Sequence, residues 1–157
     1  MAEYRIHVHV GRNIIFIISA EKMIITICGS ITCMAQMKEA EKKLVDLGYK
    51  VLMPIQAEGV DYWSDDRKSR VEAKKKFEFI GEHMDKIGKS DAIFVVNITK
   101  KDVVNYIGAN TLLEIGYAHY KKKRIYFLNP IPDQPYIIDE IETVEPQIII
   151  GDYSKIQ

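Results

Sequence analysis

The stretch "MIITICGSITCMAQMKEAEKKLVDLGYKVLMP", residues 23–54, decides the fold. Its first six residues form a short apolar run, which is typical of a strand buried on both faces. After Gly29-Ser30, apolar residues recur at helical spacing as far as Gly48, a natural helix stop. A second apolar run then ends at Pro54. Because a strand, a helix and a strand follow one another, we predict a parallel pair joined by a right-handed crossover.

The same alternation continues to the end of the chain. A long helix is predicted from about Arg67, with Phe77, Ile80, Met84 and Ile87 on one apolar stripe. Further strands are predicted in "DAIFVVN" (91–97), "KRIYFLN" (123–129) and "PQIII" (146–150). We therefore predict a three-layer α/β/α sandwich with a mostly parallel sheet of about five strands, flavodoxin-like or Rossmann-like.

Residues 1–22 differ from the regular domain predicted over residues 23–157. Ile6, Val8 and Val10 alternate with His7 and His9, which suits either an added β-hairpin or an extension that the fold does not require. We predict an accessory element. The two histidines could share a metal, but no third ligand is near in the sequence, so a solvent-facing pair is expected and no metal site.

Composition excludes several classes of function. The chain has 157 residues, with 22 Lys+Arg against 22 Asp+Glu, and this balance argues against a nucleic-acid polymer as partner. No apolar run is long enough to span a membrane. Cys28 and Cys33 do not form a CxxC pair, so we expect a reduced, cytoplasmic protein in which Cys28 is a buried small residue. The dinucleotide and P-loop fingerprints are absent, and no cofactor is expected.

Ligands of such folds bind beyond the carboxyl ends of the strands. The turn "CGSIT" after the first strand offers a glycine, two hydroxyls and a following helix, so Gly29, Ser30 and Ile31 are predicted to cradle a phosphate or ribose. A simple tight turn is the alternative. In the loop over residues 55–66, Tyr62 and Trp63 could stack on a flat ligand, and a packing role is the alternative.

The loop after the third strand carries the most information. Asn97 ends the strand, and a helix N-cap is expected at Asn110 or Thr111, after Gly108. Glu114 follows Thr111 by three residues, the spacing of a capping box. A carboxylate there would also have its pKa lowered by the helix dipole, which would keep it ionised as a nucleophile should be. The pattern leaves capping and catalysis both open.

At these residues the sequence resembles a known family. The segments "ICGSI" (27–31), "SDAIFVVN" (90–97) and "GANTLLEIGYAHYKKKRIYFL" (108–128) resemble the nucleoside 2-deoxyribosyltransferase superfamily, which includes deoxynucleoside 5'-monophosphate N-glycosidases. The similarity spans roughly residues 23–130. It implies that Glu114 attacks C1' of a 2-deoxyribosyl group and that Gly29 and Ser30 lie near the sugar and its 5' substituent. It also implies a homo-oligomer, because family members complete their sites across subunits.

The sequence departs from the transferases at three places. A tyrosine near the end of the first strand is replaced by Thr26 or Ile27. An acidic residue six positions before the nucleophile is replaced by Gly108, which would leave room for a 5'-phosphate. The acidic position on the helix before the third strand falls on His83 or Asp85, and either could be the general acid. The sequence is most similar to a less characterised branch of the superfamily.

Three functions remain open on the sequence. The first is N-glycosidic bond cleavage or transfer on 2'-deoxynucleosides or their 5'-monophosphates. The second is a non-catalytic nucleotide-binding or sensing module, favoured by the missing acid, and the third is an interaction protein with a vestigial pocket. The first predicts Glu114, His83 and Asp85 as catalytic residues. Substrate-binding residues are then Gly29, Ser30, Ile31, Asn97, Gly108, Asn110, Thr111 and Trp63.

Overall fold

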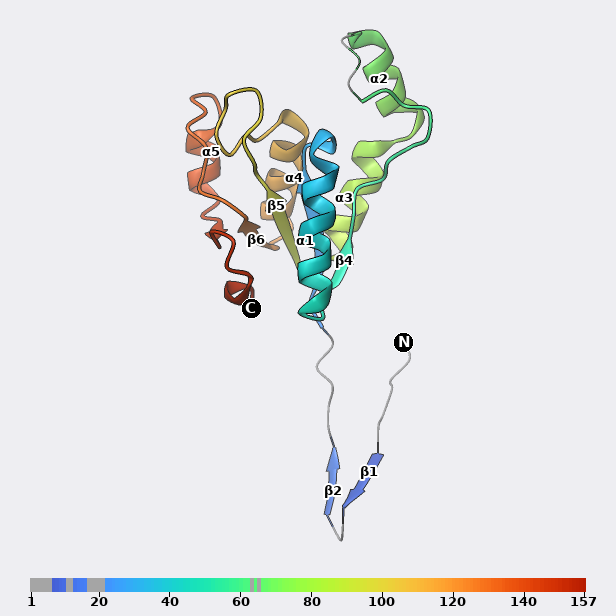
Figure 1. The fold of residues 1–157 in the computed structure, drawn as a ribbon, viewed down its shortest axis with the longest axis vertical. Helices are drawn as coiled ribbons and strands as arrows, with labels where there is room; N and C mark the ends of the chain where they lie inside the picture. The colour runs from blue at the N-terminus through green and yellow to red at the C-terminus, as the bar shows by residue number, and fades with distance from the viewer. Residues whose placement is uncertain (1–6, 11–12, 17–21, 63, 65) are drawn as a thin grey trace.

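The computed structural model of the chain describes residues 7–10, 13–16, 22–62, 64 and 66–157. Its main sheet has five strands in the order β4-β3-β5-β6-β7, and each neighbouring pair is parallel (Figure 1). The first strand of this sheet therefore lies between the second and the third, which is the flavodoxin-like order. The strands are β3 (Ile24–Gly29), β4 (Lys50–Leu52), β5 (Ala92–Val96), β6 (Arg124–Phe127) and β7 (Gln147–Ile148).

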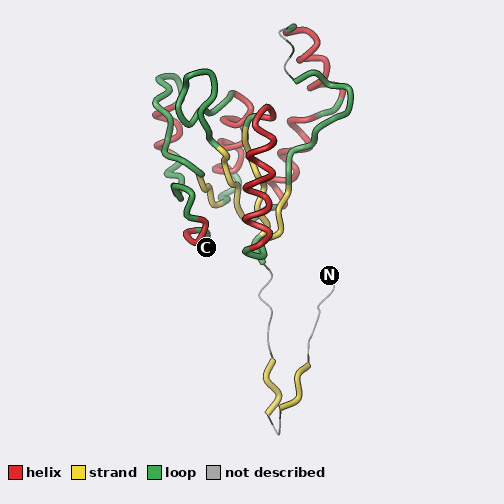
Figure 2. The backbone as a smooth tube through the Cα atoms, in the orientation of Figure 1, coloured by secondary structure: helices red, strands yellow, loops and turns green. Residues whose placement is uncertain are grey.

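Helices cover both faces of the sheet, which confirms the three-layer sandwich (Figure 2). On one face α1 packs Met37, Ala40 and Leu44 against the strands. On the other face α3, α4 and α5 do so with Ile87, Ile115 and Ile141. The helices are α1 (Met34–Asp46), α2 (Arg67–Lys76), α3 (Phe79–Lys89), α4 (Ala109–Tyr120) and α5 (Ile138–Thr143), with 3-10 turns η1 (Ile31–Cys33) and η2 (Tyr153–Lys155).

The central strands are apolar along their whole length because both faces are covered. All five residues of β5 are buried, and so are the four inner residues of β3. Successive residues of a strand point to opposite faces. Ile25 and Ile27 therefore join the core beside α1, whereas Cys28 joins the core beside α3 and α4.

The prediction of one long helix from Arg67 is wrong, because the helix is broken between α2 and α3. Glu78 adopts a left-handed conformation with φ 47° and ψ 32°, which a continuous helix does not allow. Most residues of α2 are themselves charged, and none of its side chains is buried. The predicted apolar stripe is also only partly buried, since Phe77 and Ile80 are 36% and 41% exposed.

Within residues 1–22, the structure describes two strands and Lys22. β1 (His7–Val10) pairs antiparallel with β2 (Asn13–Phe16) in a two-stranded sheet of their own. Gly11 and Arg12, which join the two strands in the sequence, lie outside the described residues, so the predicted hairpin is seen as its two strands. Across the described part of the chain, no helix combines the length and the apolarity that a membrane span requires.

Candidate active site

A pocket of about 290 Å³ lies beyond the carboxyl ends of β3, β4 and β5. This is the switch point of the sheet, where connections from neighbouring strands diverge and leave a crevice. The turn after β3 and the N-terminal half of α4 form one side. Side chains from the β4–α2 loop, α2 and α3 form the other, including Ile55, Val60, Arg70, Ala73, Lys74, Phe79, Ile80, His83 and Met84.

Glu114 reaches this pocket from the second turn of α4. The helix begins at Ala109, its N-cap is Gly108, and no side chain caps it. The predicted N-cap at Asn110 or Thr111 is therefore wrong, and so is the capping box. The reason is tertiary: the amide side chain of Gln134 bonds both backbone groups of Ile107, at 2.7 and 3.1 Å, which fixes the chain just before the helix. Glu114 lies too far along α4 to cap it.

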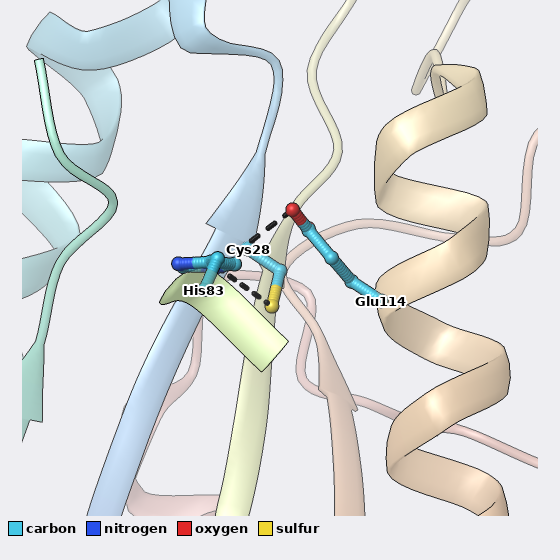
Figure 3. Close-up of side chains that lie close together, drawn as sticks. All are labelled: Cys28, His83 and Glu114. Carbon is cyan, nitrogen blue, oxygen red and sulfur yellow. Dashed lines mark hydrogen bonds and ion pairs between the residues drawn. The ribbon is translucent and has the colours of Figure 1, made fainter. Parts of the chain in front are cut away.

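Cys28, His83 and Glu114 converge from three different elements (Figure 3). Cys28 ends the apolar part of β3, His83 lies on the buried side of α3, and Glu114 lies on α4. The Nε2 atom of His83 is 3.7 Å from Oε1 of Glu114 and 3.7 Å from Sγ of Cys28. The three donor atoms all lie within 4.8 Å of one another. Cys28 is completely buried, and the side chains of His83 and Glu114 are only 5% and 13% exposed.

Burial keeps this cluster uncharged at neutral pH. Loss of solvent raises the pKa of Glu114 to about 8 from an ordinary value of 4.5, and the nearby Cys28 side chain opposes this shift. Burial, helped by the charge of Lys86, lowers the pKa of His83 to about 4. Burial likewise raises the pKa of the Cys28 thiol. The helix dipole was expected to lower the pKa of Glu114, and that expectation is wrong because desolvation dominates beyond the first turn.

The distance between His83 and Glu114 would suit an ion pair, but both pKa shifts oppose charge separation. We therefore describe them as a neutral pair in contact, too far apart for a hydrogen bond. Two buried polar atoms of the pair, Nδ1 of His83 and Oε2 of Glu114, have no hydrogen-bond partner among the described residues. Buried polar atoms are nearly always satisfied in folded proteins, so these two atoms are positions where water or a bound group would make a contact.

A cationic and hydroxyl-rich area lies beside the cluster. Lys100 donates a hydrogen bond of 2.8 Å to Oγ of Ser30, which lies 2.9 Å from Oγ1 of Thr32. Lys74 donates to Oδ1 of Asn110 at 3.3 Å, near the free N–H groups at the start of α4. Lysines, hydroxyls and a helix N-terminus together favour an anion.

The pocket lining also contains aromatic rings. The rings of Tyr62 and Phe79 lie 6.0 Å apart, and Phe79 stacks on Phe77 with their centroids 5.3 Å apart. The Tyr62 hydroxyl accepts a hydrogen bond of 2.8 Å from the backbone N–H of Ala57, which holds the ring at the pocket. Flat apolar surfaces of this kind suit the faces of a heterocyclic base.

The structure places many of the predicted site residues around the pocket. Beside Glu114 and His83, these are Gly29, Ser30, Ile31, Gly108, Asn110 and Thr111. Asp85 is not among them: it is exposed on the solvent side of α3, about half a turn away from His83. Trp63 lies outside the described residues.

Asn97 does not line the pocket either. It is buried, and its side-chain amide donates to the carbonyls of Asn129 and Pro130 at 3.0 and 2.9 Å and accepts from the Asn129 N–H at 2.9 Å. Its polar atoms are thus occupied in tying the β5 loop to the β6 loop. The structure assigns Asn97 a structural role and does not support it as a ligand-binding residue.

Sequence reasoning missed Cys28 and the cations Arg70, Lys74 and Lys100 as site residues. Cys28 could have been found from its position directly before the Gly29 turn, on the opposite strand face from Ile27. Lys100 lies in the loop that the strand-end rule selects. Arg70 and Lys74 gave no signal, because α2 is charged on every side.

No family model matches the chain, and no curated protein matches it. Among solved structures, the chain is similar to a 2-deoxyribosyltransferase from the psychrotolerant bacterium Bacillus psychrosaccharolyticus. The two are 18% identical, the match covers 66% of this chain and 70% of that chain, and the TM-score is 0.44. A likeness of this size does not extend to activity.

Proposed function

We propose that the chain cleaves or transfers the N-glycosidic bond of 2'-deoxynucleoside 5'-monophosphates, with Glu114 as the nucleophile. The observation that carries this proposal is the position of Glu114. It is the carboxylate at the inner end of a strand-end pocket, and its Oε2 atom has no partner among the described residues. The family resemblance of residues 23–130 points to the same glutamate.

The reaction follows the retaining course for two successive displacements. Burial keeps Glu114 protonated near neutral pH, so it first gives its proton to solvent. An oxygen of the resulting carboxylate then forms a bond to C1' while the bond from C1' to the base nitrogen breaks. The electron pair leaves with the base, which takes up a proton from water. A covalent glycosyl-enzyme results. Water, or the nitrogen of a second base, then attacks C1', releases Glu114 and gives up a proton.

The departing base needs a proton, and the two predicted donors fit this need poorly. Asp85 faces solvent, and burial keeps His83 uncharged at neutral pH. We therefore assign His83 to positioning Glu114. A 2-deoxy sugar lacks the electron-withdrawing 2'-hydroxyl and forms its oxocarbenium ion readily. We therefore expect the reaction to proceed without a strong acid at the leaving base, but slowly.

The cations beside the cluster favour a nucleotide over a nucleoside. Ser30, Lys100 and the start of α4 would receive the 5'-phosphate, and Tyr62 and Phe79 would contact the base. Gly108 lines the pocket beside Tyr106, whose ring an added Cβ would meet at 3.3 Å. A homo-oligomer remains part of this proposal.

A non-catalytic nucleotide-binding module is the second candidate, and one observation favours it. A carboxylic acid with a pKa of about 8 is mostly protonated at neutral pH and is then no nucleophile. In that case Glu114 would donate a hydrogen bond to a ribose or phosphate oxygen.

The test is base release from a panel of 2'-deoxynucleosides and their 5'-monophosphates, with and without acceptor bases, in buffer containing EDTA. We expect release from monophosphates that disappears in Glu114→Gln, an uncharged variant of nearly the same shape. Glu142→Gln, an exposed glutamate on α5, is the matched control. Monophosphate binding by calorimetry that persists in Glu114→Gln, without release by the parent protein, would establish the binding module instead.

A further inference from the structure

The cluster of Cys28, His83 and Glu114 presents three donor atoms of kinds that transition metals prefer. A thiol sulfur, an imidazole nitrogen and a carboxylate oxygen come from β3, α3 and α4, and all three lie within 4.8 Å of one another. No metal was expected from the sequence, because the three residues are far apart along the chain. The fold brings them together.

The spacing of the donors fits one small ion. In a tetrahedral zinc site with bond lengths of about 2.0 to 2.3 Å, two ligand atoms lie roughly 3.3 to 3.8 Å apart. The separations of His83 Nε2 from Cys28 Sγ and from Glu114 Oε1 are both 3.7 Å. The donor atoms of Cys28 and Glu114 lie within 4.8 Å of each other.

We propose that Cys28, His83 and Glu114 form a binding site for Zn²⁺, and that the bound ion withdraws Glu114 from the reaction. The second part rests on the proposed function. Sulfur and nitrogen donors disfavour Mg²⁺ and Ca²⁺, which require oxygen ligands. Three protein ligands leave a fourth position, and since His83 and Glu114 line the pocket, that position faces the ligand space.

Binding balances without any redox change. The Cys28 thiol gives its proton to solvent and binds as thiolate, neutral His83 contributes the lone pair of Nε2, and Glu114 binds as carboxylate. The ion supplies the positive charge that this buried cluster lacks. It also gives the Glu114 carboxylate a positively charged partner.

The experiment uses the full chain with Co²⁺ as a spectroscopic substitute for Zn²⁺. A thiolate ligand produces a charge-transfer absorption band with Co²⁺ that histidine and carboxylate ligands do not produce. We expect this band in the parent protein and in Cys33→Ser, and we expect Zn²⁺ to remove it by displacement. Cys33 is the matched control because it is the other buried cysteine and lies outside the cluster.

The band should disappear in Cys28→Ser, and Zn²⁺ affinity measured by equilibrium dialysis should fall more than about 100-fold, since even outer-shell partners are worth roughly 10- to 100-fold. His83→Gln should weaken binding similarly, whereas His119→Gln, at an exposed position, should not. Circular dichroism of each variant identifies any that fail to fold. A band that survives Cys28→Ser, or no band in the parent protein, overturns the proposal.

The metal site and the proposed function fail separately. If the cobalt band depends on Cys28 but no base is released in EDTA, the metal site stands and the glycosidase does not. If base is released and the band is absent, the reverse holds. If both are present, Zn²⁺ should inhibit release and EDTA should restore it. Inhibition should be weaker in Cys28→Ser relative to its own zinc-free rate.

Discussion

Nε2 of His83 lies 3.7 Å from Oε1 of Glu114, and both groups are buried at the inner end of the pocket. In water such a histidine and glutamate would carry opposite charges near pH 5 to 6. Here burial lowers the pKa of His83 and raises the pKa of Glu114, and both shifts favour the uncharged forms. The proton therefore resides on the glutamate.

Stability should depend on pH through Glu114. Its pKa is raised in the folded chain from 4.5 to about 8, so the folded state loses stability as pH rises between these values and loses no more above them. Glu114→Gln has no proton to lose, while Cys28 and His83 remain as neighbours. In EDTA, the free energy of unfolding of the variant, relative to that of the parent protein, should therefore rise by on the order of a few kcal/mol from pH 5 to pH 8.5. Thermal unfolding measured across this range checks it, and parallel pH profiles for the two proteins would count against a buried, protonated Glu114.

Lys100 should govern the preference for a phosphate. Lys100→Gln removes a charge-assisted contact and should weaken binding of a deoxynucleoside 5'-monophosphate roughly 10- to 100-fold. Binding of the corresponding nucleoside should change little. Calorimetry with both ligands measures the difference, and Lys101→Gln, an exposed neighbour on the same loop, is the control. Equal losses for nucleotide and nucleoside would place the phosphate elsewhere.

Asn97 should matter for stability and not for binding. Asn97→Ala removes three side-chain hydrogen bonds and leaves two carbonyls and an N–H near Asn129 unpaired. We expect a loss of about 2 to 4 kcal/mol in the free energy of unfolding. Urea denaturation provides the measurement, with Asn110→Ala, which has one long hydrogen bond, as comparison. A near-neutral result would mean that the two loops are held together by other contacts.

Gly116 should be replaceable by alanine. It lies within α4, and a Cβ built there meets nothing within 4 Å. Gly116→Ala should stabilise the helix by about 0.5 to 1 kcal/mol. By contrast, a Cβ at Gly29 would meet Sδ of Met37 and the carbonyl oxygen of Val96, each at 3.3 Å, and Gly29→Ala should destabilise the chain. If Gly116→Ala is destabilising instead, this face of α4 is covered in solution, as a homo-oligomer would require.

Replacing Glu78 by glycine should not reduce the stability of the chain. Its left-handed backbone, with φ 47°, costs a residue with a Cβ roughly 1 kcal/mol. Glu78→Gly should therefore be neutral or stabilising, although glycine has a more flexible unfolded state. Glu82→Gly, four residues later inside α3, should cost about 1 kcal/mol. Equal destabilisation by both changes would show that the helix continues through residue 78.

The sheet could be predicted because each strand is a short apolar run bounded by a turn or a helix. Burial on both faces imposes that pattern whatever the tertiary details. The helix break could not be predicted, because apolar residues continue through Phe77 and Ile80 at helical spacing. These side chains have the spacing of a buried helical stripe, but both are partly exposed and Ile80 lines the pocket.

Part of the site followed from the strand-end rule, which selected the turn holding Gly29 and Ser30 and the loop that leads into the helix of Glu114. The start of α4 did not follow, since the bonds from Gln134 to Ile107 override the local capping pattern. The pKa of Glu114 could not be predicted either, because it depends on α3 burying the carboxylate. The meeting of Cys28 with His83 is likewise a tertiary contact with no local signal.

The weak attachment of α2 has a consequence for amide hydrogen exchange. This helix buries no side chain, yet Arg70 and Lys74 line the pocket. Its amides should exchange through small local openings, whereas those of β3 and β5 should exchange only when the whole domain unfolds. A ligand that contacts α2 must be released before the helix opens. Protection of the α2 amides should then rise with ligand concentration, which would give a binding constant even for a ligand that is never turned over.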